Sequence, residues 1–134
     1  MKTAPNGPCP CQSARKYKKC CKPVLAGAVA TTPEALMRSR YCAYAIGQVD
    51  HIQRTTHPQS PHWQPNAQTW REELLAFCAQ TSFEGLDVHS SETKGSQGWV
   101  HFTAHLVQAG EPLLLEERSL FLKEENRWLY VRGV

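Results

Sequence analysis

The chain has 134 residues, a formal net charge of +3, and 41% hydrophobic and 20% charged residues, which is the balance of one ordinary globular domain. No apolar run approaches the roughly 20 residues that a membrane-spanning helix needs, and the N-terminus carries no apolar stretch typical of a signal peptide. These features argue against a membrane-spanning or exported protein and predict a cytoplasmic one.

Basic residues are concentrated at the N-terminus. Residues 1–22 carry six Lys or Arg side chains and no acid, so the remaining nine basic and twelve acidic residues leave the rest of the chain at a formal charge of −3. The composition changes at Pro23, where a small, neutral stretch begins that is typical of a linker or a lightly packed crossing segment. We therefore expect a basic head at residues 1–23 and a larger body at residues 24–134.

Four of the six cysteines lie within the head, in the pattern C-x-C-x8-C-C. Two close pairs of thiols on either side of a short loop can supply the four ligands of a tetrahedral zinc ion. About twenty residues cannot bury enough apolar surface to fold unaided, whereas structural zinc contributes about 10–16 kcal/mol in small finger peptides. The sequence therefore predicts a structural zinc site without an open position for catalysis, formed by Cys9, Cys11, Cys20 and Cys21.

Two disulfides and a set of unpaired surface thiols are the alternatives. A disulfide between neighbouring cysteines, or across one residue, is strained and easily reduced. Lys16, Lys18 and Lys19 favour zinc, because they would relieve the formal −2 charge of a four-thiolate centre. Together with Arg15 they form the predicted partner-binding surface, for which an acidic protein is the simplest partner. Nucleic acid is a weaker alternative, because only Tyr17 is available to stack on a base.

The head resembles the SEC-C motif, a short zinc module known from the tail of the preprotein translocase motor ATPase, whose usual form is C-P-C-G-S-G-x-x-x-K-x-C-C or C-H. Gln12 and Ala14 occupy the two glycine positions of the motif. In the translocase the module binds an acidic export chaperone and membrane lipid, so the resemblance implies a role in recognition. The matching positions are Cys9, Pro10, Cys11, Ser13, Lys18, Cys20 and Cys21.

The body changes from helical spacing to strand alternation near its middle. Residues 32–34, Thr-Pro-Glu, are typical of a helix start, and we expect that helix to end near Gly47. A short helical turn and a proline-punctuated loop precede a second helix over residues 67–80. From Glu84 onward, alternating apolar residues predict four antiparallel strands. Helices followed by an antiparallel meander predict an α+β roll, with the sheet curled around the helices.

Residues 36–58, 84–86 and 116–133 of the body resemble the YchJ-like family of bacterial proteins. This family joins an N-terminal SEC-C motif to a nuclear-transport-factor-two-like, or cystatin-like, roll. The resemblance implies a conical pocket between the concave face of the sheet and the helices. The same scaffold serves isomerases, hydratases and binding proteins, so the fold alone does not choose a function.

Arg40 falls within the apolar arc of the first helix, so its charge needs a partner. We expect it either to reach the rim or to pair with Glu116 or Glu117. A carboxylate and a histidine in one dry cavity would permit general acid–base catalysis, so an enzyme competes with a simple binding protein. The candidate pocket residues are Arg40, Tyr44, His57, His101, Glu117, Arg118 and Ser119.

The remaining histidines and cysteines have simpler expected roles. Cys42 and Cys78 are expected to be small buried apolar residues rather than nucleophiles, and His57 is expected on an exposed loop if it does not rim the pocket. His51, His57 and His62 have no regular face on which to converge on a second metal ion. We therefore predict a monomeric or weakly associating zinc protein with a basic interaction head and a roll that can bind a small ligand.

Overall fold

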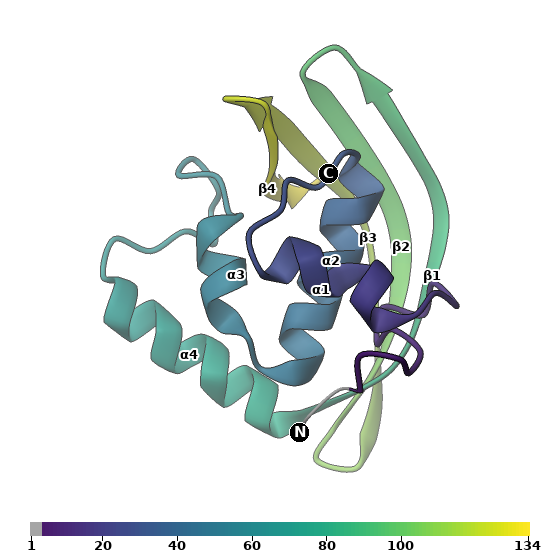
Figure 1. The fold of residues 1–134 in the computed structure, drawn as a ribbon. Coiled ribbons are helices and arrows are strands. Elements are labelled where there is room, and N and C mark those ends of the chain that lie inside the picture. Colours follow the sequence, from purple (N-terminus) through teal and green to yellow (C-terminus); the bar gives the residue numbers. More distant parts are fainter. Residues whose placement is uncertain (1–3) are drawn as a thin grey trace.

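The computed structural model describes residues 4–134 and contains one four-stranded antiparallel sheet whose helices lie against a single face (Figure 1). The strands follow one another in the sheet in chain order, which confirms the predicted α+β roll with an antiparallel meander. The helices are η1 (Tyr17–Lys19), α1 (Cys21–Leu25), α2 (Pro33–Ile46), α3 (Val49–Arg54) and α4 (Ala67–Gln80). The strands are β1 (Thr81–Lys94), β2 (Gln97–Gln108), β3 (Glu111–Glu124) and β4 (Arg127–Gly133).

Helix α2 begins and ends where the sequence predicts. The Thr32 hydroxyl accepts a hydrogen bond from the Ala35 backbone N–H at 3.0 Å, and Pro33 occupies the first turn. Gly47 has φ of 78° and ends the helix in the left-handed conformation that glycine adopts without strain. Helix α4 is capped in the same way by Asn66, whose side-chain oxygen accepts from the Thr69 N–H at 3.0 Å.

The two faces of the sheet differ in what covers them. Successive side chains of a strand point to opposite faces, and in β2 the set with Val100, Phe102, Ala104 and Leu106 faces the helices. The alternate set of β2, which includes His101, lies on the outer face. Register shifts in the pairing of β1 with β2 mark local irregularities of the ladder, which bend and twist strands.

The N-terminal head packs against α2 and shares the core of the roll. Cys11, Tyr17, Cys21 and Leu25 belong to the same buried cluster as residues of α2 and the sheet. The Arg38 guanidinium of α2 donates a hydrogen bond to the Cys11 carbonyl at 2.9 Å. Helix α1 runs across the predicted boundary after residue 23. Among residues 4–134, none of the helices is both long and apolar enough to cross a bilayer.

Candidate metal centre and ligand cavity

The four cysteines of the head bring their sulfur atoms together, with all four lying within 4.8 Å of one another. The Cys11 and Cys20 sulfurs are 3.5 Å apart, and those of Cys20 and Cys21 are 4.0 Å apart. A tetrahedral ion with metal–sulfur bonds near 2.3 Å requires sulfurs separated by about 3.8 Å. All four are free thiols, so the disulfide alternative is wrong, and the cluster can bind a metal ion.

Local hydrogen bonds hold these sulfurs in place. The Cys9 N–H donates to the Arg15 carbonyl at 2.8 Å, which closes the loop that carries Cys9 and Cys11. The Cys20 N–H donates to the Tyr17 carbonyl at 3.1 Å. The Ser13 hydroxyl lies 3.2 Å from the Cys20 sulfur and can donate to it as a thiolate. The turn of η1 therefore returns the second pair of cysteines to the first pair.

The loop between the two cysteine pairs keeps a backbone shape that favours glycine. Gln12 has φ of 67° and Ala14 has φ of 69°, and these are the two positions at which the SEC-C motif has glycine. A side chain in the left-handed region costs about 1–2 kcal/mol per residue. The head therefore keeps the turns of the motif at some cost in stability.

Replacing Ala14 by glycine is therefore expected to stabilise the metal-loaded protein by about 1 kcal/mol, because the relief of strain exceeds the added chain entropy of glycine. Chemical unfolding of wild-type and variant protein measures the difference. Ala26→Gly is the matched control: Ala26 is exposed with φ of −83°, so glycine there relieves no strain and is expected to lower stability. If both variants lost stability equally, the claim that the positive φ of Ala14 strains the backbone would be wrong.

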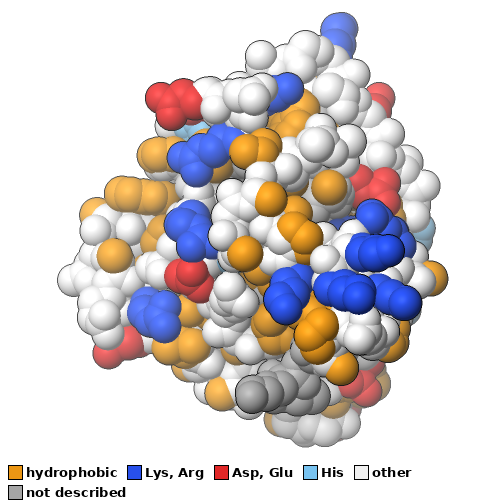
Figure 2. Space-filling view, in the orientation of Figure 1, with side chains coloured by type: hydrophobic (Ala, Val, Ile, Leu, Met, Phe, Trp, Pro, Cys, Tyr) orange, Lys and Arg blue, Asp and Glu red, His pale blue; other side chains and the backbone are white. Residues whose placement is uncertain are grey.

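The basic residues of the head lie on the surface beside the cysteine cluster. Figure 2 shows Lys and Arg side chains gathered over the N-terminal segment, and Arg15, Lys16, Lys18 and Lys19 are all exposed. The Arg15 guanidinium donates to the Lys19 carbonyl at 2.6 Å, which ties one of the cations to the end of η1. The three lysines make no salt bridge with an acidic residue among residues 4–134.

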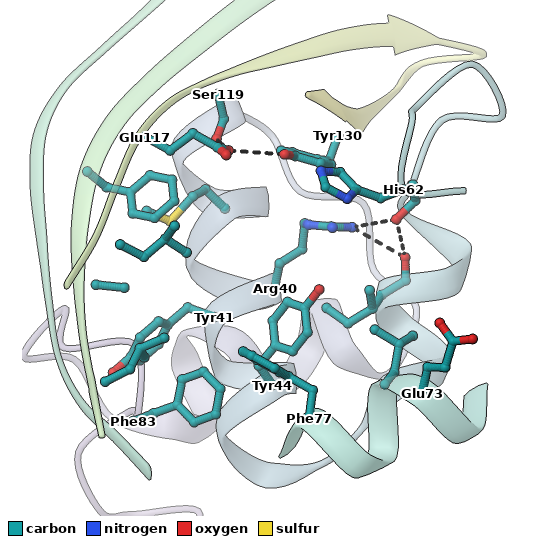
Figure 3. Close-up of a pocket in the computed structure, with 18 of the residues that line it drawn as sticks. Arg40, Tyr41, Tyr44, His62, Glu73, Phe77, Phe83, Glu117, Ser119 and Tyr130 are labelled. Carbon is teal, nitrogen blue, oxygen red and sulfur yellow. Dashed lines mark hydrogen bonds between the residues drawn. The ribbon is translucent and has the colours of Figure 1, made fainter. Parts of the chain in front are cut away.

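A cavity of about 420 Å³ lies between α2, α4 and the inner face of the sheet (Figure 3). This volume is within the range of small-molecule sites. Four of the seven candidate pocket residues line it, namely Arg40, Tyr44, Glu117 and Ser119. Seven aromatic residues also line it, namely Tyr41, Trp70, Phe77, Phe83, Phe102, Phe121 and Tyr130, together with several aliphatic residues and the polar residues His62, Gln64 and Glu73.

Arg40 is buried in this cavity with only 8% of its surface exposed. One guanidinium nitrogen donates to the hydroxyls of Thr55 at 2.8 Å and Thr56 at 3.1 Å. The guanidinium carbon lies 4.6 Å from the centre of the Tyr130 ring, within the range of a cation–π contact. Burial lowers the pKa of Arg40, because removal from water disfavours the charged form.

The expected ion pair between Arg40 and a glutamate is not formed. Within residues 4–134, no carboxylate oxygen lies within 4.0 Å of the Arg40 guanidinium. Glu117 instead accepts hydrogen bonds from the Tyr130 hydroxyl at 3.0 Å and from Ser119. Glu116 is on the outer face of the sheet, because strand alternation separates it from Glu117. Arg40 is thus a buried cation with neutral partners.

Two tyrosines supply hydroxyl groups near Arg40. Burial raises the pKa of Tyr44 and of Tyr130, so both phenols keep their protons and can donate hydrogen bonds. The Tyr44 hydroxyl points toward the Arg40 side chain in Figure 3. The cavity therefore offers a guanidinium and a phenol as donors and the carboxylates of Glu117 and Glu73 as acceptors, within a partly aromatic lining.

His57, His101 and Arg118 do not line this cavity. His57 is buried, and its ring nitrogen lies 2.7 Å from a carboxylate oxygen of Glu124. The expectation of an exposed loop histidine is therefore wrong. The backbone N–H of His57 donates to the Tyr130 carbonyl and holds this segment against β4. His101 and Arg118 are on the outer face of the sheet, opposite the helices.

Thr55, Thr56 and Tyr130 surround Arg40 and were not among the predicted pocket residues. The threonines follow α3 in a stretch without a periodic pattern, so no signal in the sequence placed them beside α2. Alternation puts Trp128 and Tyr130 on one face of β4, but only the structure shows that Tyr130 pairs with the inward-facing Phe121 of β3. Cys42 is completely buried as predicted, whereas Cys78 is half-buried.

Comparison with known proteins agrees with both parts of this architecture. Residues 32–133 match the family described as "YchJ, middle NTF2-like domain", and residues 6–23 match the SEC-C motif. The chain is 41% identical over 128 residues to the UPF0225 protein YchJ of Shigella dysenteriae, covering 93% of this chain and 81% of that protein.

Two solved structures have the same fold over nearly the whole chain. A SEC-C motif containing protein from Rhodopseudomonas palustris superposes with a TM-score of 0.80 at 36% identity, covering 96% of this chain and 98% of that one. Another from Psychrobacter arcticus gives a TM-score of 0.79 at 23% identity, covering 95% and 81%. With the cysteine head and the roll both matched, this chain belongs to the YchJ family of SEC-C proteins with an NTF2-like domain.

Proposed function

We propose that the chain is a zinc-stabilised binding protein whose basic head recognises an acidic protein surface. The observation that carries this proposal is the convergence of four sulfurs within 4.8 Å of one another beneath exposed lysines. Thiolates select soft or borderline ions such as zinc, and four of them complete a tetrahedral shell. Zinc would therefore be structural here, and the chemistry it supplies is the folding of the head.

The surface of the head supports protein recognition. Lys16, Lys18 and Lys19 are exposed on a segment whose cysteines pack into the core shared with α2. A basic surface attracts acidic partners and speeds their encounter. Docking of the head on α2 also means that a partner would meet head and roll in one fixed orientation.

Charge reversal tests the partner surface without disturbing the metal site. Affinity capture from bacterial extract with the wild-type protein, followed by mass spectrometry, is expected to recover an acidic partner that is lost with Lys16→Glu, Lys18→Glu and Lys19→Glu combined. The matched control reverses two exposed cations of the roll, Lys94 and Arg132, and should retain the partner. If a Cys9→Ser, Cys11→Ser variant captured the same partner equally well, the proposal that the zinc-stabilised head recognises the partner would be wrong.

The nucleic-acid alternative has its own readout. If the head held phosphates, mixed oligonucleotides would shift in a gel with the wild-type protein, and the shift would weaken steeply with added salt. We expect no such salt-dependent shift, because Tyr17, the aromatic residue near the lysines, is buried and cannot stack on a base.

We also propose that the roll binds a small molecule with an apolar body and an anionic or acceptor group. The supporting observation is Arg40, whose charge has no carboxylate partner within 4.0 Å among residues 4–134 although the side chain is buried. A buried cation is costly unless it is paired, and a bound anion would supply the pair. The aromatic residues that line the cavity match the body of such a ligand.

Matched pairs of acids and amides test this ligand class. We expect trans-cinnamate to shift the NMR signals of Phe77, Phe102 and the Arg40 side chain at concentrations where trans-cinnamamide does not. The two probes share size and shape, so the difference reports the charge. Equal shifts from acid and amide would leave an apolar cavity without anion recognition and would contradict the role given to Arg40.

A further inference from the structure

The outer face of the sheet gathers three side chains that can ligate a metal. His89 of β1, His101 of β2 and Glu116 of β3 each place a ligand atom within 4.8 Å of the others. The ring nitrogen of His101 lies 2.7 Å from a carboxylate oxygen of Glu116. The rings of His89 and His101 have centroids 4.7 Å apart. Three adjacent strands thus contribute one group each.

Strand register explains how these residues meet. His101 pairs with Ser90 of β1, and Glu116 pairs with Thr103 of β2, so His101 and Glu116 are diagonal neighbours on one face. A register shift between Val88 and Ser90 interrupts the ladder at His89. The three residues are far apart in the sequence, so no short metal-binding motif predicts the cluster.

We propose that His89, His101 and Glu116 form a second metal site, open and exchangeable, for a divalent transition-metal ion. Two imidazoles and one carboxylate suit zinc, cobalt, nickel or copper, whereas the four thiolates of the head form a closed shell. The His101 side chain is 36% exposed and that of Glu116 is 63% exposed. Solvent, or a group from a bound molecule, would fill the remaining coordination positions.

The surroundings of the site leave its ligands available. The His89 ring nitrogen lies 2.8 Å from the Thr103 hydroxyl, a neutral group that a metal can replace. Arg118, the nearest cation along β3 on this face, is paired with Glu92 at 2.8 Å and lies over the Trp99 ring. Its charge is therefore already matched by a carboxylate.

A neighbouring pair supplies an internal control. His105 lies two residues beyond Thr103 on the same face of β2, and its ring nitrogen is 2.7 Å from a carboxylate oxygen of Asp87. The pair contributes a single histidine and a single carboxylate, and it is outside the group whose atoms converge within 4.8 Å. Its side chains are also exposed, so His105→Ala changes the surface in the same way as His101→Ala.

Cobalt binding to the zinc-loaded protein tests the proposal. Equilibrium dialysis is expected to find one further Co²⁺ per chain, without the sulfur-to-cobalt charge-transfer absorption that cysteine ligation would produce. Loss of a group that merely orients a metal ligand costs about 10–100-fold in affinity. His101→Ala, His89→Ala and Glu116→Gln remove ligands themselves, so each should weaken Co²⁺ binding by at least about 100-fold and leave the zinc content unchanged.

The control and the overturning results are equally specific. His105→Ala should bind Co²⁺ as the wild-type protein does. The proposal is overturned if zinc-loaded wild-type protein binds no Co²⁺, if His101→Ala binds it with unchanged affinity, or if His105→Ala weakens binding as much as His101→Ala. Thermal unfolding of each zinc-loaded variant without added Co²⁺ checks that the sheet is intact, because these exposed positions are expected to change stability little.

Discussion

The Cys11→Ser variant is expected to lose the metal of the head and to melt at least about 10 °C below the wild-type protein. Cys11 is completely buried and belongs to the core that the head shares with α2. Its carbonyl also accepts the hydrogen bond from Arg38. Removal of one of four thiolates therefore weakens metal binding and at the same time loosens the contact between head and roll.

Elemental analysis and differential scanning calorimetry measure this effect. A strong chelator should move the melting curve of the wild-type protein toward that of Cys11→Ser, because metal binding and folding of the head are linked. Cys78→Ser is the matched control: Cys78 is half-buried on α4, outside the cysteine cluster, and should keep its metal and nearly its full stability. A Cys11→Ser protein with full metal content and an unchanged melting curve would refute the metal centre.

The Arg40→Met variant is expected to be more stable than the wild-type protein by about 1–2 kcal/mol, while losing the binding of small carboxylates. The charge of Arg40 is costly to bury, and methionine fills a similar volume without a charge. The threonine hydroxyls that accept from Arg40 also donate to backbone carbonyls, at 2.7 Å from Thr55 to His51 and from Thr56 to Ile52. Their donors therefore stay satisfied after the substitution.

Arg38→Met on the same helix is the matched control, for which the expected change in stability has the opposite sign. Arg38 pairs with Glu34 at 3.0 Å and donates to the Cys11 carbonyl, so its loss removes favourable contacts and should lower stability. Chemical unfolding measures stability, and NMR titration with trans-cinnamate measures binding. If Arg40→Met proved as destabilising as Arg38→Met, Arg40 would stabilise the fold. Its burial would then carry no free-energy cost for a bound anion to offset.

The helix ends, the cysteine cluster and the β2 strand were predictable because residues close together in the sequence determine each of them. Helix α2 begins at the capping hydroxyl of Thr32 and ends at Gly47, and each end is set by contacts within a single turn. The cysteine pairs converge across one short loop, so their spacing alone indicates a metal site. Alternation in β2 likewise predicts a strand from adjacent residues.

The cavity and the outer cluster depended on contacts between distant segments. Alternation shows that His101 and Phe102 lie on opposite faces of β2, but only packing against α2 and α4 shows which face is inside. The same holds for Glu116 and Glu117 in β3, and one step in register exchanges their surroundings. For this reason His101 was predicted in the pocket and is found outside, beside Glu116.

By itself, the sequence determined the cysteine cluster of the head, the two long helices and the strand order, because short-range hydrogen bonds, caps and thiol spacing specify them. The tertiary structure alone decided that Arg40 is buried beside neutral partners and that the His57 backbone N–H donates to the Tyr130 carbonyl. It also joined His89, His101 and Glu116 across three strands. Such groupings follow from how the curved sheet packs on the helices, and no local pattern encodes that arrangement.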